Sequence, residues 1–285
     1  LCRYLLPITM TKWSMISIFI FIVCFLLWHF RKDLVSTFGN RLLLAIILLL
    51  LGGLVFIWVA GSLMYTRTKA SDPQQLKKLE SAAFKGDSSA VQNILKSMGS
   101  AGSLKASDLH GRSPLMAAAE GGHVDVIKEL LDAKENVNAA DDQGWTPLMA
   151  AAGAGHARAV RLLLSRGAAP NSANRSGRTA LMGSAFLGKQ AAMQELLKGG
   201  ADPNLQDGDG WTATRWAAKG GHAGSVALLA RHGADPDRRD WNGWTPLMAA
   251  ALDGENTAVV SALLAAGAGP DARGPDSNTP LLTAA

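Results

Sequence analysis

The sequence of 285 residues predicts an all-α solenoid of stacked helix-turn-helix units, preceded by two transmembrane helices. One glycine series recurs every 33 residues, at Gly111, Gly144, Gly177, Gly210 and Gly243. A second series has the same spacing, at Gly122, Gly155, Gly188, Gly221 and Gly254. Two series with one period indicate a single repeated structural unit, and a period of this size is typical of a stacked-repeat solenoid.

Two apolar runs near the N-terminus predict a membrane hairpin over residues 14–65, after an N-terminal flank of residues 1–13. Residues 14–30 and 42–65 contain no Asp, Glu, Lys or Arg. At about 1.5 Å per helical residue, the second run is roughly 36 Å long, enough to cross a hydrocarbon core of about 30 Å. The lipid bilayer is therefore an expected partner of residues 14–65. A cleaved signal peptide is the alternative for the first run, although bulky residues end it where small ones should mark cleavage.

Basic residues around the hairpin predict which side of the membrane the repeats occupy. A hairpin places both of its ends on one side, where six Lys and Arg residues lie, against three in the loop of residues 31–41. The positive-inside rule then favours a cytoplasmic location for the repeats. Because the margin is small, a periplasmic or other extracytoplasmic location stays open as the alternative.

The positive charge of the chain belongs to its N-terminal segment. Residues 1–75 account for the whole formal net charge of +5, and the remainder has equal numbers of basic and acidic residues. A neutral repeat region lacks the basic stripe that phosphate binding requires, so no nucleic-acid partner is expected. Both cysteines, Cys2 and Cys24, precede the repeats, which excludes a disulfide framework or a cysteine metal site there.

The repeat domain is expected over residues 73–285, after a polar linker of residues 66–72. Its first unit, 73–107, is expected to hold helices near 73–84 and 88–97. Five full units and one partial unit follow, at residues 108–140, 141–173, 174–206, 207–239 and 240–273, and then 274–285.

Each part of the unit at 141–173 has a local reason to fold. Thr146 and Pro147 provide an N-cap and a proline at the first helical position. Gly155 and the residue after it end a slim, alanine-rich first helix. An apolar second helix follows, and Gly167 ends it where a left-handed cap favours glycine.

These features resemble the ankyrin-repeat family. The segments SPLMAAAEGGH at 113–123 and TPLMAAAGAGH at 146–156 are similar to its Thr-Pro-Leu-His, Ala-Ala and Gly-His pattern. The tails GAAPN at 167–171 and GGADPN at 199–204 are similar to its Gly-Ala-Asp-x-Asn pattern. The resemblance covers residues 108–273 closely. It implies helix-turn-helix units with short β-turn or hairpin tips, and a domain that binds another protein.

The unit at 207–239 departs most from the pattern of its neighbours. Ala213 replaces the proline, Thr214 replaces the core leucine and Arg215 stands where the other full units have methionine. We expect this unit to be the least stable of the stack. We also expect Trp216 to fill core space beside Thr214.

No sequence motif for chemistry is found. A phosphate-binding loop, a nucleophile elbow and an HExxH motif are all missing, so we expect no catalytic residue, no cofactor and no enzymatic activity. His123, His156 and His222 occupy equivalent positions in their units. Stacked units lie about 8–10 Å apart, whereas zinc ligands lie about 2 Å from the metal, so no metal site is expected there. Each histidine is expected to form a hydrogen bond at a helix start.

The resemblance also implies where a partner protein would bind. In ankyrin-like stacks the turn tips and first helices line a concave face that commonly holds the partner. We call the corresponding residues here the tip strip: His110, Arg112, Gln143, Trp145, Arg175, Arg178, Phe186, Leu187, Asp209, Trp211, Trp241, Asn242 and Trp244. Tryptophan and arginine are enriched in binding hot spots. For Trp145, Trp211 and Trp244, packing on the next turn is the alternative role.

The sequence therefore predicts a membrane-anchored scaffold or adaptor that binds another protein through an ankyrin stack. One alternative is a regulatory ankyrin domain of a larger membrane transporter or enzyme, because a further unit begins at Asn278 and stops inside its first helix. The other alternative is the same adaptor on the extracytoplasmic side.

Overall fold

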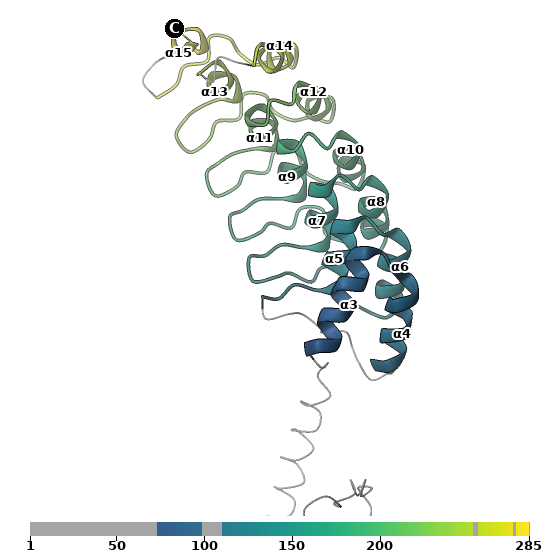
Figure 1. Cartoon of the computed structure of the whole chain (residues 1–285). Helices are drawn as coiled ribbons and strands as arrows, with labels where there is room; N and C mark the ends of the chain where they lie inside the picture. Colours follow the sequence, from purple (N-terminus) through teal and green to yellow (C-terminus); the bar gives the residue numbers. More distant parts are fainter. Residues whose placement is uncertain (1–72, 99–109, 253–255, 276–277, 285) are drawn as a thin grey trace, which may run out of the picture. The chain divides into compact units, whose positions relative to one another are not determined.

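The repeat region is a stack of short helices in two layers (Figure 1). The computed structural model describes residues 73–98, 110–252, 256–275 and 278–284. The helices in these ranges belong to one compact unit, Lys69–Ala285. Within them, no helix combines the length and the apolar character needed to span a bilayer. The two expected membrane spans, 14–30 and 42–65, lie outside the described residues.

First and second helices alternate along the chain. The first helices are α3 (Pro73–Lys85), α5 (Pro114–Gly121), α7 (Pro147–Ala154), α9 (Ala180–Phe186), α11 (Ala213–Lys219), α13 (Pro246–Leu252) and α15 (Pro280–Ala284). The second helices are α4 (Ser88–Met98), α6 (Val124–Asp132), α8 (Ala157–Ser165), α10 (Gln190–Lys198), α12 (Ala223–Arg231) and α14 (Thr257–Ala265). The first helices lie between the second helices and the projecting turns (Figure 1). The all-helical solenoid expected from the sequence is confirmed.

Side-chain caps determine where the first helices begin. The Thr146 hydroxyl accepts a hydrogen bond from the backbone N–H of Met149 at 3.3 Å, and Pro147 starts the helix. Gly155 ends α7 with a φ of +87°, in the left-handed region that glycine adopts without a steric cost. α7 has only eight residues, and helices this short are marginal on their own. Packing against neighbouring repeats must therefore stabilise them.

The buried side chains form one continuous core along the stack. The leucines at the equivalent position of four first helices are at most 2% exposed: Leu115, Leu148, Leu181 and Leu247. Second helices contribute pairs such as Val160 and Leu163, both fully buried. Alanines on the first helices allow neighbouring backbones to approach closely. Each repeat thus completes its apolar face only against the next repeat, as expected of a solenoid.

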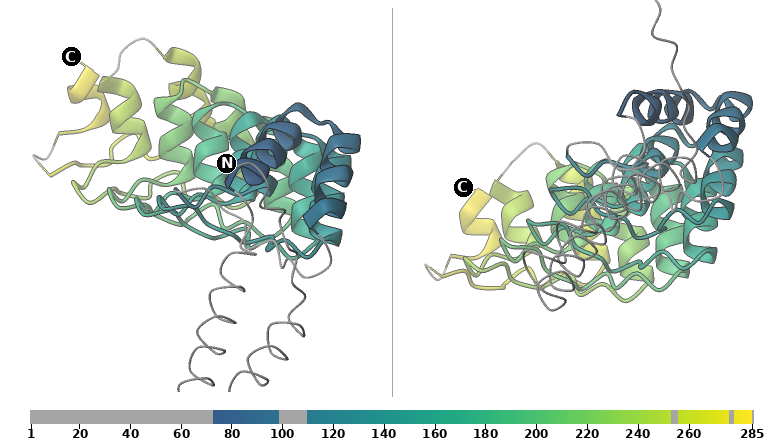
Figure 2. Two further views of the ribbon diagram at one scale, coloured as in Figure 1. Left: turned by 60° about the horizontal axis from the view of Figure 1, so that its bottom comes forward. Right: turned by 90° about the horizontal axis from the view of Figure 1, so that it is seen from below.

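In each of the turn tips that precede α7, α9, α11 and α13, one side chain accepts two backbone hydrogen bonds from the turn. The Oδ1 atom of Asp141 accepts hydrogen bonds from the backbone N–H groups of Gln143 and Trp145, both at 2.8 Å. Equivalent pairs of hydrogen bonds are accepted by Asn174, Asp207 and Asp240. The Arg175 N–H also donates to the Gln143 carbonyl of the preceding tip at 2.9 Å. The tips therefore form one edge of the stack, which the further views show (Figure 2).

A second set of contacts links the loops that follow the second helices. The Asn138 amide donates to the Gly167 carbonyl at 3.1 Å and accepts from the Ala169 N–H at 2.9 Å. Asn171 and Asn204 repeat this bridge to the next unit. Side-chain amides can serve here because they both donate and accept.

Two of the equivalent histidines link neighbouring repeats. The Nε2–H of His123 donates to the Phe84 carbonyl at 2.9 Å, and that of His156 donates to the Glu120 carbonyl at 3.0 Å. Both residues stand at helix starts and are hydrogen-bonded, as expected. Neither side chain caps its own helix, however, because each one reaches the carbonyl of the preceding repeat.

Candidate functional site

The tip strip combines residues of the turn tips with Phe186 and Leu187, which lie at the C-terminal end of α9. Its large apolar side chains are exposed, with fractional exposures of 66% for Trp241, 47% for Leu187, 43% for Trp145 and 40% for Phe186. Exposed aromatic and aliphatic side chains gathered on one edge of a fold mark an interaction surface more often than isolated ones do. Trp145 thus has a large accessible area for a partner, in addition to any part of its ring that packs on the next turn.

The remaining tip-strip residues differ in their burial and contacts. Trp211 and Trp244 are half-buried, which agrees with a partial packing role. The side chains of His110, Gln143, Arg175, Asp209 and Asn242 are exposed. Arg112 forms an ion pair with Glu120 at the end of α5, so that part of the strip is locally neutral.

Backbone groups of the tip strip are largely used inside the stack. The His110 carbonyl accepts from the Asp142 N–H at 2.8 Å, and the Asp209 carbonyl accepts from the Trp241 N–H at 3.3 Å. A partner would therefore contact side chains on this edge, because neighbouring tips already satisfy these backbone groups.

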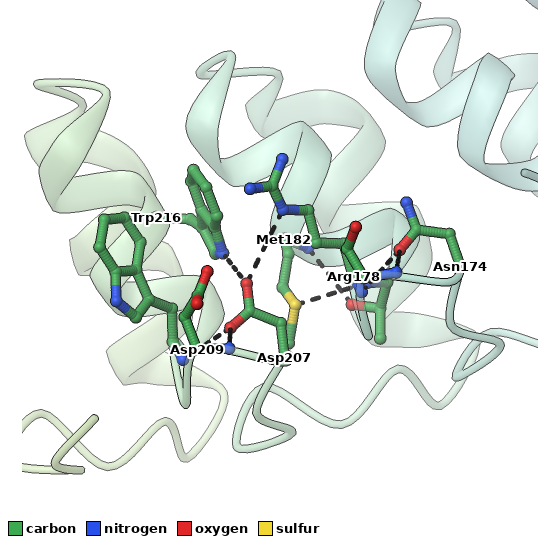
Figure 3. A network of polar contacts seen from close by, with 9 residues as sticks. Asn174, Arg178, Met182, Asp207, Asp209 and Trp216 are labelled. Atoms are coloured by element: carbon green, nitrogen blue, oxygen red, sulfur yellow. Dashed lines mark hydrogen bonds and ion pairs between the residues drawn. The ribbon is translucent and has the colours of Figure 1, made fainter. Parts of the chain in front are cut away.

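A cluster of interacting side chains connects two adjacent repeats in the middle of the strip. We call it the Trp216 cluster, and its members are Arg178, Phe186, Asp207, Trp211, Arg215 and Trp216. Figure 3 shows Arg178, Asp207 and Trp216 of this cluster. The Phe186 and Trp216 rings meet edge to face, with centroids 5.5 Å apart. The Trp211 and Trp216 ring centroids lie 4.7 Å apart. Such ring pairs add stability beyond the burial of their area.

Two guanidinium groups lie over the tryptophan rings of this cluster. The Arg178 Cζ atom is 4.2 Å from the centroid of Trp216, and the Arg215 Cζ atom is 4.3 Å from that of Trp211. Each distance is well within the range of a cation–π interaction. The arginines are therefore held in place while their charge stays near the surface.

Asp207 is the buried acid that organises the cluster. Its side chain lies between Arg178 and Trp216 in Figure 3, and the residue is 4% exposed. The Trp216 Nε1–H donates to Oδ2 at 2.9 Å, and the Arg178 Nε atom is 3.8 Å from the same oxygen. The other oxygen, Oδ1, accepts the two backbone hydrogen bonds of the turn. One carboxylate thus fixes both the turn and the tryptophan.

The sequence predicts Phe186, Arg178 and Trp211 on the strip but does not bring Asp207 and Trp216 into it. Trp216 was expected to fill core space, and it does pack partly against the core. Its indole N–H also reaches Asp207, which places the ring on the strip side of α11. Tryptophan in place of the alanine or glycine of the other full units was the signal for this difference. The Thr214 hydroxyl, by contrast, is buried without a hydrogen-bond partner among the described residues.

Glu135 is a second residue with a contact role that the sequence does not predict. It occupies a buried position that holds alanine at Ala168, Ala201 and Ala234, and it is 5% exposed. Burial raises the pKa of its carboxyl group to about 7, hydrogen bonds from the Ser113 hydroxyl and the Leu115 N–H oppose this, and the nearby Glu80 adds to it. The signal in the sequence is an acid at the position that holds alanine in the three following units.

The described residues contain no group of three or more His, Cys, Asp or Glu side chains that could hold a metal ion. What the candidate site offers is a row of exposed apolar side chains together with arginines that rings and a carboxylate hold in position. This arrangement is suited to recognition of another molecule, because ordered arginine and aromatic side chains lose little conformational freedom on binding.

Comparison with known proteins agrees with this architecture. A family model described as ankyrin repeats in three copies matches residues 79–174, 135–207 and 181–273. No curated protein sequence matches the chain. The ankyrin-repeat domain of human ASB11 superposes with a TM-score of 0.65 at 27% identity, covering 73% of this chain and 91% of that one. The ankyrin-repeat domain of Bcl-3, described as a unique member of the IkappaB protein family, superposes with a TM-score of 0.65 at 26% identity, covering 73% of this chain and 93% of that one.

Ankyrin repeats form protein–protein interaction domains. The matched residues extend over more than half of the chain, and two solved ankyrin-repeat domains superpose on it with TM-scores of 0.65. The chain belongs to the ankyrin-repeat family.

Proposed function

We propose that this protein is a membrane-anchored scaffold that binds another protein through its tip strip. The observation that carries the proposal is the exposure of large apolar side chains on the turn tips and at the end of α9: Trp145, Phe186, Leu187 and Trp241. Aromatic residues of this kind are the usual anchors of protein interfaces. The proposed role is binding, and it needs no cofactor or catalytic residue.

The membrane anchor in this proposal is the predicted hairpin of residues 14–65. It is supported by the length of the apolar runs 14–30 and 42–65 and by their lack of charged residues. An anchor would raise the local concentration of the repeats near a membrane-associated partner without adding any contact. We propose the cytoplasmic side for the repeats, on the balance of basic residues.

Protease access tests the anchor and its orientation. In intact cells, a cytoplasmic repeat domain should resist added protease and become sensitive only when the cells are opened. Cleavage in intact spheroplasts would place the repeats outside the cytoplasm. Release of the uncleaved chain from membranes by carbonate washing would contradict the anchor itself.

Partner capture tests the binding strip. Trp145→Ala together with Trp241→Ala should abolish crosslinking of the full chain to its partner, while far-ultraviolet circular dichroism stays unchanged. A matched control is Leu264→Ala on α14, because Leu264 is 45% exposed but belongs to the layer of second helices. Capture that survives the double substitution, or that is lost equally in the control, would contradict the strip as the binding surface.

A further inference from the structure

The basic side chains of the interaction edge are concentrated in two adjacent repeats. The tips and first helices of units 174–206 and 207–239 carry Arg175, Arg178, Arg215 and Lys219. The same segments contain two acids, Asp207 and Asp209. Asp207 is buried and its charge is compensated by Arg178 and the Trp216 N–H. These segments therefore carry four basic and two acidic side chains, a net charge of +2, and Asp209 is the one exposed acid among them.

The neighbouring units differ in charge. In unit 141–173, the tip and first helix carry Asp141 and Asp142 but no lysine or arginine. In unit 240–273, the described part of the tip and first helix carries Asp240 and again no basic residue. Arg239, just before this tip, donates to the Gly243 carbonyl at 2.8 Å and to the Arg273 carbonyl at 2.6 Å. The basic side chains therefore lie in the middle of the strip and beside the tip of unit 240–273, whereas unit 141–173 contributes none. A continuous stripe for a long polyanion would need basic residues in that unit as well.

Exposed apolar side chains adjoin this positive region. Phe186 and Leu187 end α9, and the Phe186 ring contacts Trp216, over whose face the Arg178 guanidinium lies. A second guanidinium, that of Arg215, lies over Trp211. Ring contacts within the chain therefore hold two arginines in position close to exposed apolar side chains. Guanidinium groups held in this way pair well with carboxylates, because less freedom is lost per hydrogen bond formed.

We propose that the partner presents an acidic protein segment to the Trp216 cluster. Its carboxylates would pair with Arg178 and Arg215, and an adjoining apolar side chain would pack on Phe186 and Leu187. This inference rests on the proposed function and adds the chemical class of the segment that the strip recognises. Charge complementarity between the middle of the strip and the segment selects acidic over basic or neutral sequences.

Selection from random peptides tests the inference. The full chain is placed in nanodiscs of phosphatidylcholine and used to select from a phage-displayed library of random peptides. Selected peptides should be enriched in Asp and Glu next to aliphatic or aromatic residues. A synthetic peptide from the selection should bind more weakly after its acids are replaced by Asn and Gln, and more weakly at high salt, because exposed charge pairs are screened.

Paired variants assign the effect to the arginines. Arg178→Gln with Arg215→Gln should weaken binding of the acidic peptide between about two- and thirtyfold, the effect of two exposed charge pairs. Arg178→Lys with Arg215→Lys should retain the preference for acidic over neutralised peptide. The matched control is Arg158→Gln with Arg231→Gln, which removes the same charge from exposed positions on the second helices α8 and α12 and should leave binding unchanged.

The outcomes separate this inference from the proposed function. Peptides that depend on Trp145 and Trp241 but are neutral or basic would refute the acidic segment and leave the binding strip in place. Equal loss in the control pair would show a non-specific charge effect and also refute it. A selection that yields no peptides, or only peptides indifferent to all tip-strip variants, would contradict both. Enhanced binding to phosphatidylserine nanodiscs or to nucleic acid, with no peptide preference, would replace the protein segment by another polyanion.

Discussion

Glu135 should make the stability of the N-terminal part of the stack depend on pH. Its carboxyl group is buried and has a pKa of about 7, against 4.5 for an ordinary glutamate. The folded state therefore binds a proton at pH values where the unfolded chain has lost it. As pH rises from 4.5 to about 7, the free energy of unfolding should fall, and above that range this contribution should be constant.

The size of the effect follows from the two pKa values. A tenfold difference in proton affinity corresponds to about 1.4 kcal/mol. The difference between 4.5 and about 7 then corresponds to about 3 kcal/mol between acid and neutral pH. Glu135→Gln removes the titration and keeps an oxygen that can accept from the Leu115 N–H, which now donates to Glu135 at 3.0 Å. The variant should match the natural protein near pH 4.5 and exceed its stability by up to about 3 kcal/mol above pH 7.

Urea unfolding of the repeat unit, followed by circular dichroism across this pH range, measures the effect. Hydrogen exchange should place the gain in α3 and α5, because Glu135 contacts the start of α5 and lies near Glu80 of α3. The control is Lys134→Gly. Lys134 has a φ of +68°, so glycine should shift stability by the same amount at every pH. Equal pH dependence of Glu135→Gln and the natural protein would refute the account.

Three further substitutions test other parts of the stack. Asp207→Asn should lower the free energy of unfolding by about 1–3 kcal/mol and change tryptophan fluorescence, because the amide lacks the charge that holds Arg178 and Trp216. The control Asp141→Asn should be nearly neutral, since an asparagine, Asn174, accepts the same two hydrogen bonds in its own turn. Equal losses of stability would contradict this role of Asp207. Glu195→Gln should lower the stability of the protein more at neutral than at acid pH. Arg161 lowers the pKa of Glu195 through a hydrogen bond, and the stability that this pair contributes is lost as pH falls through the lowered pKa. A loss of stability that is the same at every pH would contradict this account. Thr214→Leu should raise the free energy of unfolding by about 1–3 kcal/mol, seen as a higher urea midpoint, because it buries apolar atoms where a hydroxyl has no partner among the described residues. A destabilised variant would show that no room exists for leucine.

Most of the repeat fold could be predicted because its causes are local and recur. A capping hydroxyl before proline, a left-handed glycine and an apolar face appear in one unit and again one period later. The expected helices near 73–84 and 88–97 correspond to α3 and α4 for the same reason. The membrane hairpin remains a prediction, because residues 14–65 lie outside the described part of the chain.

The candidate site could be predicted only in outline. Tip positions follow from the repeat period, so the exposure of Trp145 and Trp241 could be anticipated from their place in the unit. Contacts between units depend on side-chain directions that the period does not encode. The bond from Trp216 to Asp207 joins a helix to the turn before it. The raised pKa of Glu135 depends on the burial of its carboxyl group and on Glu80 of the preceding repeat, and the repeat period encodes neither.

Position-specific photocrosslinking most directly tests the claim that one edge of this stack captures another protein. A photoreactive amino acid is placed at Gln143 or Arg175 on the strip, and at Arg158 or Arg231 on the second helices, in the full chain expressed in its own cells. The account predicts one shared partner crosslinked from the strip positions and little from the other two. Equal or stronger crosslinking of that partner from Arg158 and Arg231 would contradict it.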